Sequence, residues 1–291
     1  MQEFSYHGPT TVAEAIGLLT DDEARVLAGG TDLVPQLREG RRHTRRIVDL
    51  KRIPELVTIE PLGNGGWRMG AAVGIGRLAR HAALAEAHPG LIEAACLIGS
   101  LQIQNRATLG GNLCNAAPSA DAVPLLVALG AQAEVAGPQG RRTVAVESIP
   151  TAPGRAALGP GEIVVAILLP PRPARSAARY LRMTPRREMD IAVAGAAAGL
   201  TLDAAAGTVI AARIVLASVG PTPLRAPQAE AALLGQRPSL DIFHAAGAAA
   251  ATDARPISDT RGSAEYRREL VAVLTRRALQ RCAHDLGIAL S

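Results

Sequence analysis

Two stretches with paired glycines constrain this chain most, and the longer one spans residues 107–121. Its Gly110-Gly111 pair lets the backbone approach a bulky group, because glycine has no Cβ. Small polar side chains around the pair supply neutral donors and acceptors, at Thr108, Asn112, Asn115 and Ser119. The only carboxylate of the stretch, Asp121, comes where a helix is expected to begin. We predict that Asp121 caps this helix, beside backbone N–H groups that suit an anion.

An earlier segment, residues 25–33, has the same design. It predicts a short strand over residues 25–28, a turn at Gly29-Gly30, and a capped helix over residues 32–38. Two strand–glycine–helix turns in one chain can hold the two ends of one extended ligand that bears phosphate groups, because helix starts present N–H groups to anions.

Both segments resemble those of the FAD-binding subunits, or domains, of the molybdenum hydroxylases, the family of xanthine dehydrogenase and carbon monoxide dehydrogenase. The resemblance continues through residues 180–192 and 258–268 and covers nearly the whole chain. It implies a two-lobed FAD-binding domain of the vanillyl-alcohol-oxidase (PCMH) type rather than a Rossmann fold. In that fold the two glycine loops wrap the pyrophosphate and hold the cofactor between two α/β lobes.

Carried over residue by residue, the resemblance implies a set of FAD-binding positions. The first loop contributes Arg25, Val26, Leu27, Ala28, Gly29, Gly30, Thr31, Asp32 and Leu33. The second contributes Thr108, Gly110, Gly111, Asn112, Cys114 and Asp121, and apolar positions beside the flavin match Ile163 and Val164. Arg182 falls where relatives such as xanthine dehydrogenase have a lysine near the flavin or its phosphates, a difference that keeps charge but changes geometry. No histidine or cysteine lies where flavin attachment is expected, so FAD is expected to be non-covalent.

The resemblance also implies partners. A small subunit holds two 2Fe–2S clusters, and a large subunit holds molybdopterin and oxidises the substrate, in a heterotrimer or a dimer of heterotrimers. Electrons would reach the FAD from the clusters and leave to NAD⁺, a quinone or another acceptor. The chain is thus expected to be an oxidoreductase subunit that works in a complex, with no catalytic side chain or metal ligand of its own.

Periodicity and turn signals predict an α+β chain, and 291 residues are enough for two domains. The clearest linker is the proline-rich run of residues 170–176. We expect an FAD-binding domain over residues 1–172, with lobes at about 1–55 and 56–172. A second domain, similar to the C-terminal domain of carbon monoxide dehydrogenase flavoproteins, is expected over residues 177–288. Three strand-like runs predict a three-stranded antiparallel sheet there, followed by helices whose last member carries an apolar stripe: Tyr266, Leu270, Val273, Leu274 and Leu279.

Composition excludes several other functions. The net charge of +5 suits nucleic acid, but aromatic residues make up only 2% of the chain, so the base-stacking side chains of single-strand binders are missing. A basic surface that faces an acidic partner subunit is favoured. The cysteines, Cys96, Cys114 and Cys282, are too far apart for a zinc or iron–sulfur spacing. We find no apolar run that would span a membrane and no signal peptide, so a soluble, cytoplasmic protein is expected.

Two alternatives stay open. Residues 74–79 match the G-x-G-x-x-G/A dinucleotide pattern, but no strand ending in an acidic residue follows about 20 residues later, as a Rossmann unit requires. A glycine-rich turn is therefore favoured there. The basic residues 38–46 and the arginine-rich last helix also allow a flavin-free scaffold that joins partner subunits.

Overall fold

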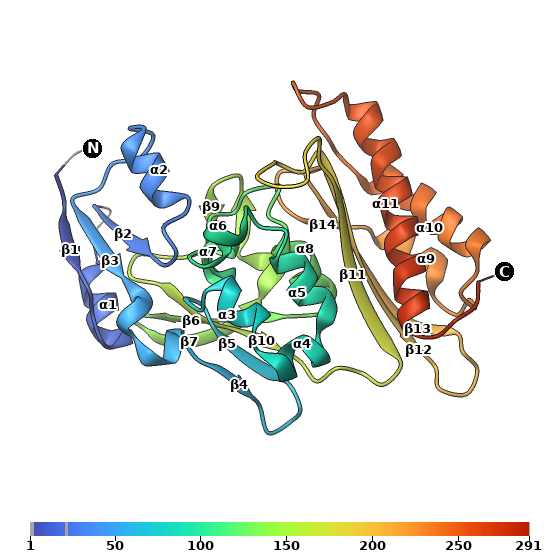
Figure 1. Cartoon of the computed structure of the whole chain (residues 1–291), viewed down its shortest axis with the longest axis horizontal. Helices are drawn as coiled ribbons and strands as arrows, with labels where there is room; N and C mark the ends of the chain where they lie inside the picture. Colours follow the sequence, from blue (N-terminus) through green and yellow to red (C-terminus); the bar gives the residue numbers. More distant parts are fainter. Residues whose placement is uncertain (1–2, 21–22, 291) are drawn as a thin grey trace.

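The computed structural model describes residues 3–20 and 23–290 and shows two α/β lobes followed by a layer of sheet and helices (Figure 1). Residues 1 and 2, with which the first predicted domain begins, lie outside the described residues. The first lobe is a parallel sheet in the order β1-β3-β2, built from β1 (Ser5–His7), β2 (Ala24–Leu27) and β3 (Arg46–Asp49). Helices α1 (Val12–Leu18) and α2 (Leu33–Arg38) connect the strands.

The two helices of this lobe begin differently. The capping box predicted for α1 is confirmed, since the Glu14 amide donates to Oγ1 of Thr11 and the Glu14 carboxylate accepts from the Thr11 amide. The capped start predicted for α2 is wrong. Asp32 stands at its N-cap with φ −105° and ψ −46°, and its side chain bonds no helix amide. A capping side chain needs an extended backbone, and Asp32 is already helical.

The second lobe is an antiparallel sheet in the order β4-β5-β10-β6-β7. Its strands are β4 (Ile59–Pro61), β5 (Trp67–Gly70), β6 (Gln132–Gly137), β7 (Gly140–Ala145) and β10 (Ile163–Leu169). Short helices follow β5: α3 (Ile75–Ala79), α4 (Ala82–Ala87), α5 (Pro89–Ala95), α6 (Leu101–Gln104), α7 (Leu109–Cys114) and α8 (Ala122–Ala128). The remaining pieces are a hairpin of β8 (Pro150–Ala152) and β9 (Arg155–Ala156), and three 3₁₀ turns, η1 (Leu50–Arg52), η2 (Pro54–Leu56) and η3 (Val146–Ser148).

The second glycine stretch differs from the prediction. No strand precedes it, because α6 does, and the glycines themselves lie inside α7. Thr108 caps this short helix, and its hydroxyl accepts from the Gly111 amide at 2.9 Å. Asp121 does not cap α8. Its backbone is helical, with φ −74° and ψ −35°, and its carboxylate bonds other partners.

The C-terminal domain is α+β, as predicted, but its sheet has a fourth strand. Its order is β11-β12-β13-β14, all antiparallel, with β11 (Ser176–Met183), β12 (Ala194–Leu202), β13 (Val209–Ala217) and β14 (Leu224–Arg225). The two-residue β14 is too short to give a periodic signal. Helices α9 (Pro227–Leu233), α10 (Leu240–Asp253) and α11 (Ala264–Asp285) follow, and Figure 1 shows them on one face of this sheet.

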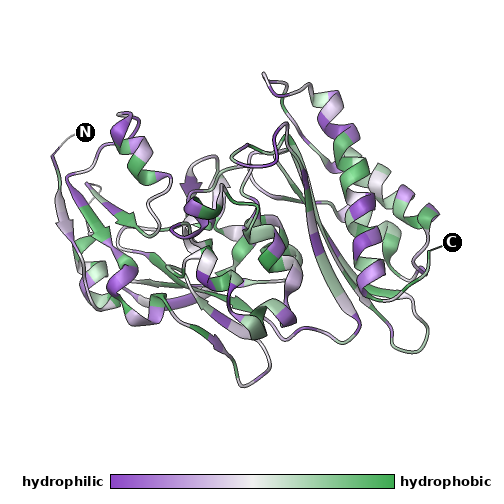
Figure 2. Ribbon diagram, in the orientation of Figure 1, coloured by the Kyte–Doolittle hydropathy of each residue, from purple (hydrophilic) through white to green (hydrophobic). Residues whose placement is uncertain are grey.

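The apolar stripe predicted for α11 is only partly right. Leu274 and Leu279 are buried, but Tyr266 is 41% exposed. The buried face also contains one cation, Arg267, and residues outside the predicted stripe: Val271, Thr275, Ala278, Cys282 and Ala283. Alternation of hydrophilic and hydrophobic stretches along the helices is visible in Figure 2. Within the described ranges no helix combines the length and apolar character that a membrane crossing requires.

Candidate functional site

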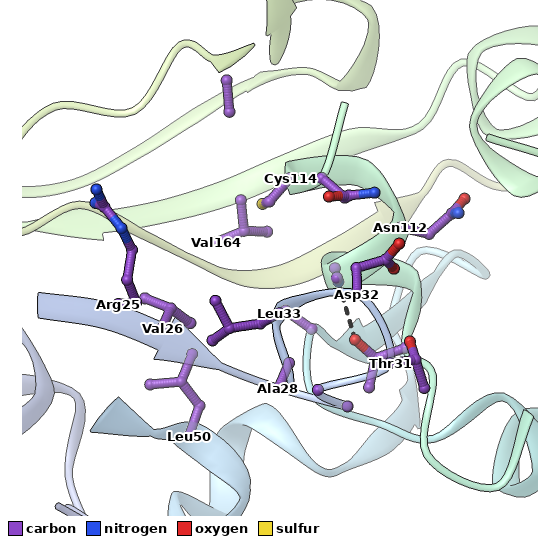
Figure 3. A pocket seen from close by; sticks show the side chains of 18 of the residues that line it. Arg25, Val26, Ala28, Thr31, Asp32, Leu33, Leu50, Asn112, Cys114 and Val164 are labelled. Atoms are coloured by element: carbon purple, nitrogen blue, oxygen red, sulfur yellow. Dashed lines mark hydrogen bonds between the residues drawn. The ribbon is translucent and has the colours of Figure 1, made fainter. Parts of the chain in front are cut away.

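A cavity of about 350 Å³ lies between the two lobes and is lined by both glycine segments. Side chains of the first lobe, such as Val26 and Leu50, face Cys114 and Val164 of the second across it (Figure 3). Of the predicted positions, it brings together Arg25, Val26, Ala28, Gly29, Gly30, Thr31, Asp32, Leu33, Thr108, Gly110, Gly111, Asn112, Cys114, Ile163 and Val164.

Two of the glycines are required by protein packing rather than by a ligand. A Cβ on Gly29 would collide with the carbonyl oxygen of Arg106, so the first glycine turn lies directly on the backbone of the second lobe. A Cβ on Gly110 would lie 2.5 Å from the carbonyl oxygen of Ala71. The first approach brings the two lobes together at the cavity, and the second seats α7 against the end of β5 within the second lobe. Gly111 differs, because the nearest atom to its Cβ position is Oγ1 of Thr108 at 3.0 Å.

The first glycine segment presents a row of free amides. Within residues 3–20 and 23–290, no backbone N–H from Gly29 to Leu33 donates a hydrogen bond to the protein. The second segment is different, since the Gly110 amide donates to the Ala71 carbonyl at 3.2 Å and the Gly111 amide to Thr108. Successive unpaired amides form a concave site for an anion. The anion-binding groups are therefore concentrated on residues 29–33.

Two buried polar atoms in the cavity wall also lack partners: Oδ1 of Asn112 and Nε of Arg25. Buried polar atoms are almost always hydrogen-bonded in native proteins. Arg25 lies toward one end of the view and Asn112 toward the other in Figure 3. An extended ligand with an anionic group and hydroxyl groups would satisfy both, since Nε donates and Oδ1 accepts.

Cys114 contributes a thiol to the cavity wall. Burial raises the pKa of this thiol to about 12. The neutral thiol is a poor nucleophile, because the thiolate is the reactive form.

Three predicted positions do not line the cavity: Leu27, Asp121 and Arg182. Leu27 is the last residue of β2, and its side chain lies against Gly30. Asp121 and Arg182 meet at the junction with the C-terminal domain, where Arg182 Nη1 donates to Asp121 Oδ2 at 2.5 Å. Tyr180 also donates to Asp121, at 3.2 Å. Burial raises the pKa of Asp121 to about 6, and both Arg182 and Tyr180 oppose that rise.

Other lining residues were not among the predicted FAD-binding positions, although Asn115 was noted as a polar residue of the second stretch: Gln36, Arg42, Leu50, Ala71, Ile98, Ala107, Asn115, Gly154, Ala156, Leu158 and Glu162. Ala107, Asn115 and Glu162 adjoin predicted positions and could have been included for that reason. Gly154 and Ala156 come from the β8–β9 hairpin, which no motif marked. A second, larger cavity of about 840 Å³ is lined by the start of α5, the proline-rich linker and strands β11–β13, and contains none of the predicted residues.

The residues between the lobes fit FAD. The free amides suit its pyrophosphate, the unpaired Asn112 oxygen suits a hydroxyl, and Ile163 and Val164 are apolar. A family model described as the FAD binding domain in molybdopterin dehydrogenase matches residues 2–172. The chain belongs to the FAD-binding subunits of the molybdenum hydroxylases. A second model, the CO dehydrogenase flavoprotein C-terminal domain, matches residues 179–282.

Relatives of this family are similar over their whole length. A putative xanthine dehydrogenase FAD-binding subunit of Escherichia coli K12 is 34% identical, with 97% of each chain covered. The carbon monoxide dehydrogenase medium chain of Afipia carboxidovorans is 36% identical, with 96% of each covered. Among solved structures, reconstituted CO dehydrogenase from Oligotropha carboxidovorans matches with a TM-score of 0.92 at 34% identity, covering 99% of each chain. The two-lobed FAD-binding fold and the oxidoreductase family predicted from the sequence are thus confirmed.

Proposed function

We propose that the chain binds FAD non-covalently between its two lobes and passes electrons from 2Fe–2S clusters in a partner subunit to an external acceptor. The observation that carries this proposal is the row of unpaired amides from Gly29 to Leu33 at the wall of a cavity that both glycine segments line. We take residues 1–172 as the FAD-binding domain and residues 177–288 as the second domain.

Each part of the cavity has a role in this proposal. The amides of residues 29–33 would hold the pyrophosphate, and Arg25 would add a positive charge. Asn112 would accept a hydrogen bond from a hydroxyl group, and Ile163 and Val164 would contact the flavin. When bound, FAD supplies a ring that exchanges electrons singly or in pairs, while the protein binds and orients it. The neutral Cys114 thiol supports non-covalent binding.

Membership of this family supports an assembly with two partners, a small subunit with 2Fe–2S clusters and a large subunit with molybdopterin. The assembly would be a heterotrimer or a dimer of heterotrimers. The relatives are named as medium chains or subunits of such enzymes. No group of side chains suited to holding a metal ion occurs in the described part of the chain. The exposed arginines of residues 38–46 suit an acidic partner surface, because charge complementarity speeds encounter.

An absorbance spectrum of the purified chain tests flavin binding. Bands near about 370 and 450 nm, the range of a bound flavin, are expected. Acid precipitation should release all of the colour, and flavin that stays in the pellet would contradict non-covalent binding. A colourless chain that does not take up added FAD, yet joins the partner subunits, would instead favour the scaffold function.

Reduction experiments test the electron route. The FAD-loaded chain should be bleached by dithionite but not by the substrate of the complex, and adding the iron–sulfur and molybdenum subunits should restore bleaching by substrate. Rapid bleaching of the isolated chain by substrate would overturn the route. Fast bleaching by NADH would identify NAD⁺ as the acceptor, and slow bleaching would favour a quinone or another carrier.

A further inference from the structure

A chain of hydrogen bonds runs along the carboxyl edge of the first sheet and ends on the first glycine segment. The Tyr6 hydroxyl donates to Oδ2 of Asp49 at 2.6 Å. Nζ of Lys51 donates to Oδ1 of Asp49 at 2.6 Å and to the carbonyl oxygen of Ala28 at 2.7 Å. The strand order β1-β3-β2 explains this arrangement, since Tyr6 lies on β1, Asp49 ends β3, and Ala28 follows β2.

The middle of this chain is shielded from solvent. Asp49 is 6% exposed, and the Lys51 side chain 26%. Burial opposes ionisation of Asp49, but hydrogen bonds from Lys51 and Tyr6 outweigh it and lower its pKa. The carboxylate is therefore ionised at neutral pH, and it fixes the Lys51 ammonium through a charge-assisted bond, which is stronger than a neutral one.

The contact with Ala28 sets the direction of the next amide. The carbonyl of Ala28 and the N–H of Gly29 belong to one planar peptide unit and point in opposite directions. Because Lys51 holds the carbonyl, the Gly29 N–H is directed as well. Gly29 is the first residue of the row of unpaired amides. Lys51 does not line the cavity, although its neighbour Leu50 does, so its effect passes through the backbone.

We propose that Lys51, aligned by Asp49, is a positioning residue that preorganises the first glycine segment for the pyrophosphate of FAD. This inference rests on the FAD site proposed above. A glycine-rich segment is conformationally free in the absence of such a restraint. Fixing it before binding raises affinity, because less ordering has to occur when the ligand arrives.

The test compares ligands with and without a pyrophosphate on the full chain stripped of flavin. Lys51→Met should weaken binding of FAD and of ADP about tenfold or more, the effect of losing a charged hydrogen bond, and should leave riboflavin binding unchanged. Lys51→Arg should recover part of the affinity, since a guanidinium can donate to both partners. Arg52→Met is the matched control, because it removes a neighbouring exposed cation from the same turn and should bind FAD as the wild type does.

Tyr6→Phe provides a milder variant, with a smaller loss of FAD and ADP affinity in the same direction. The flavin-free Lys51→Met chain should unfold at a lower temperature, because Asp49 loses its cation, so the comparison of FAD and ADP with riboflavin separates positioning from folding. Unchanged FAD and ADP affinity in Lys51→Met would overturn the positioning role of Lys51 but leave the proposed FAD site intact. Equal weakening of riboflavin binding would also overturn that role, in favour of a general role in folding. Failure of the wild-type chain to bind FAD would instead refute the proposed function.

Discussion

Arg182 of β11 and Asp121 at the start of α8 form an ion pair, 2.5 Å from Nη1 to Oδ2, across the junction of the two domains. Both side chains are buried, with 6% and 8% of their surface exposed. Tyr180, two residues before Arg182 on the same strand, bonds the second carboxylate oxygen. The pair therefore joins the C-terminal sheet to the helix that follows the second glycine segment.

Arg182→Met should destabilise the chain at pH 7.5 by roughly 3–5 kcal/mol, because it leaves a buried carboxylate without its partner. Loss of the cation raises the pKa of Asp121 further, so at pH 5 the carboxyl group is neutral and the loss should be smaller. Urea denaturation at the two pH values measures the difference. Arg182→Lys keeps the charge, so its stability should lie between that of Arg182→Met and that of the wild type. An equal loss at both pH values would contradict this account.

The pH dependence of the wild type follows from the same carboxyl group. Its pKa is about 6 in the folded chain against a usual 3.8, so the folded state holds this proton more tightly. The resulting stabilisation is fully present below about pH 4 and is lost as pH rises through about 6. Asp121→Asn should remove this slope between pH 4 and 6. Denaturant midpoints of the wild type and of Asp121→Asn, measured from pH 4 to 6, test this prediction. If stability changed with pH equally in both proteins, Asp121 would not be the titrating group.

The two neighbouring glycines of α7 should respond differently to substitution. Gly110→Ala places a Cβ 2.5 Å from the Ala71 carbonyl oxygen, and we expect a loss of about 1–3 kcal/mol in folding stability. Gly111→Arg should leave the fold intact but give a colourless protein, because its side chain would enter the cavity. Circular dichroism melting and flavin absorbance separate the two effects. A yellow Gly111→Arg protein would show that FAD does not pass this position.

Asn112 offers a test in which stability and binding move in opposite directions. Its buried Oδ1 has no partner in the flavin-free chain, and such a group costs about 1–3 kcal/mol. Asn112→Ala should therefore leave the flavin-free chain as stable or more stable, while FAD binds more weakly. Calorimetric melting of the flavin-free chain measures stability, and titration with FAD measures binding. A less stable flavin-free variant with wild-type FAD affinity would assign Asn112 a purely structural role.

The lining of the site could be predicted where it follows local motifs. The run from Arg25 to Leu33 combines a strand, a glycine turn and a helix start, and nearly all of it lies at the cavity. Asp121 and Arg182 were predicted at the same site, but neither lines the cavity. Where Arg182 of the C-terminal domain lies relative to the cavity depends on tertiary packing, which no local motif reports. The Asp49–Lys51 pair was missed for a similar reason, because a lysine two residues after an aspartate looks like any surface pair. Only the sheet order places them against Ala28.

The C-terminal domain shows the limit of periodicity. A last helix was predicted, but its buried face was only partly predicted: Arg267, Val271, Thr275 and Ala278 are buried beside the expected Leu274 and Leu279, whereas Tyr266 is exposed. Arg267 lies in an arginine-rich helix, yet it is only 4% exposed. Burial of a cation depends on acceptors that come from elsewhere in the chain, and no local pattern reports them.

Arg267 joins α11 to other segments of the C-terminal domain. Its guanidinium donates to the carbonyl oxygens of Val193 at 2.7 Å and Ser218 at 3.0 Å, and to Oδ1 of Asp259 at 2.6 Å. It thus connects α11 to the ends of β12 and β13 and to the loop before the helix. Arg267→Met leaves two carbonyls and a carboxylate without this donor, and we expect a loss of roughly 3–5 kcal/mol. Arg268→Met, at the exposed next position, is the matched control and should change stability by less than about 0.5 kcal/mol. Urea denaturation of both variants measures the difference in stability. Equal midpoints would mean that the buried Arg267 guanidinium stabilises the fold no more than a surface arginine does.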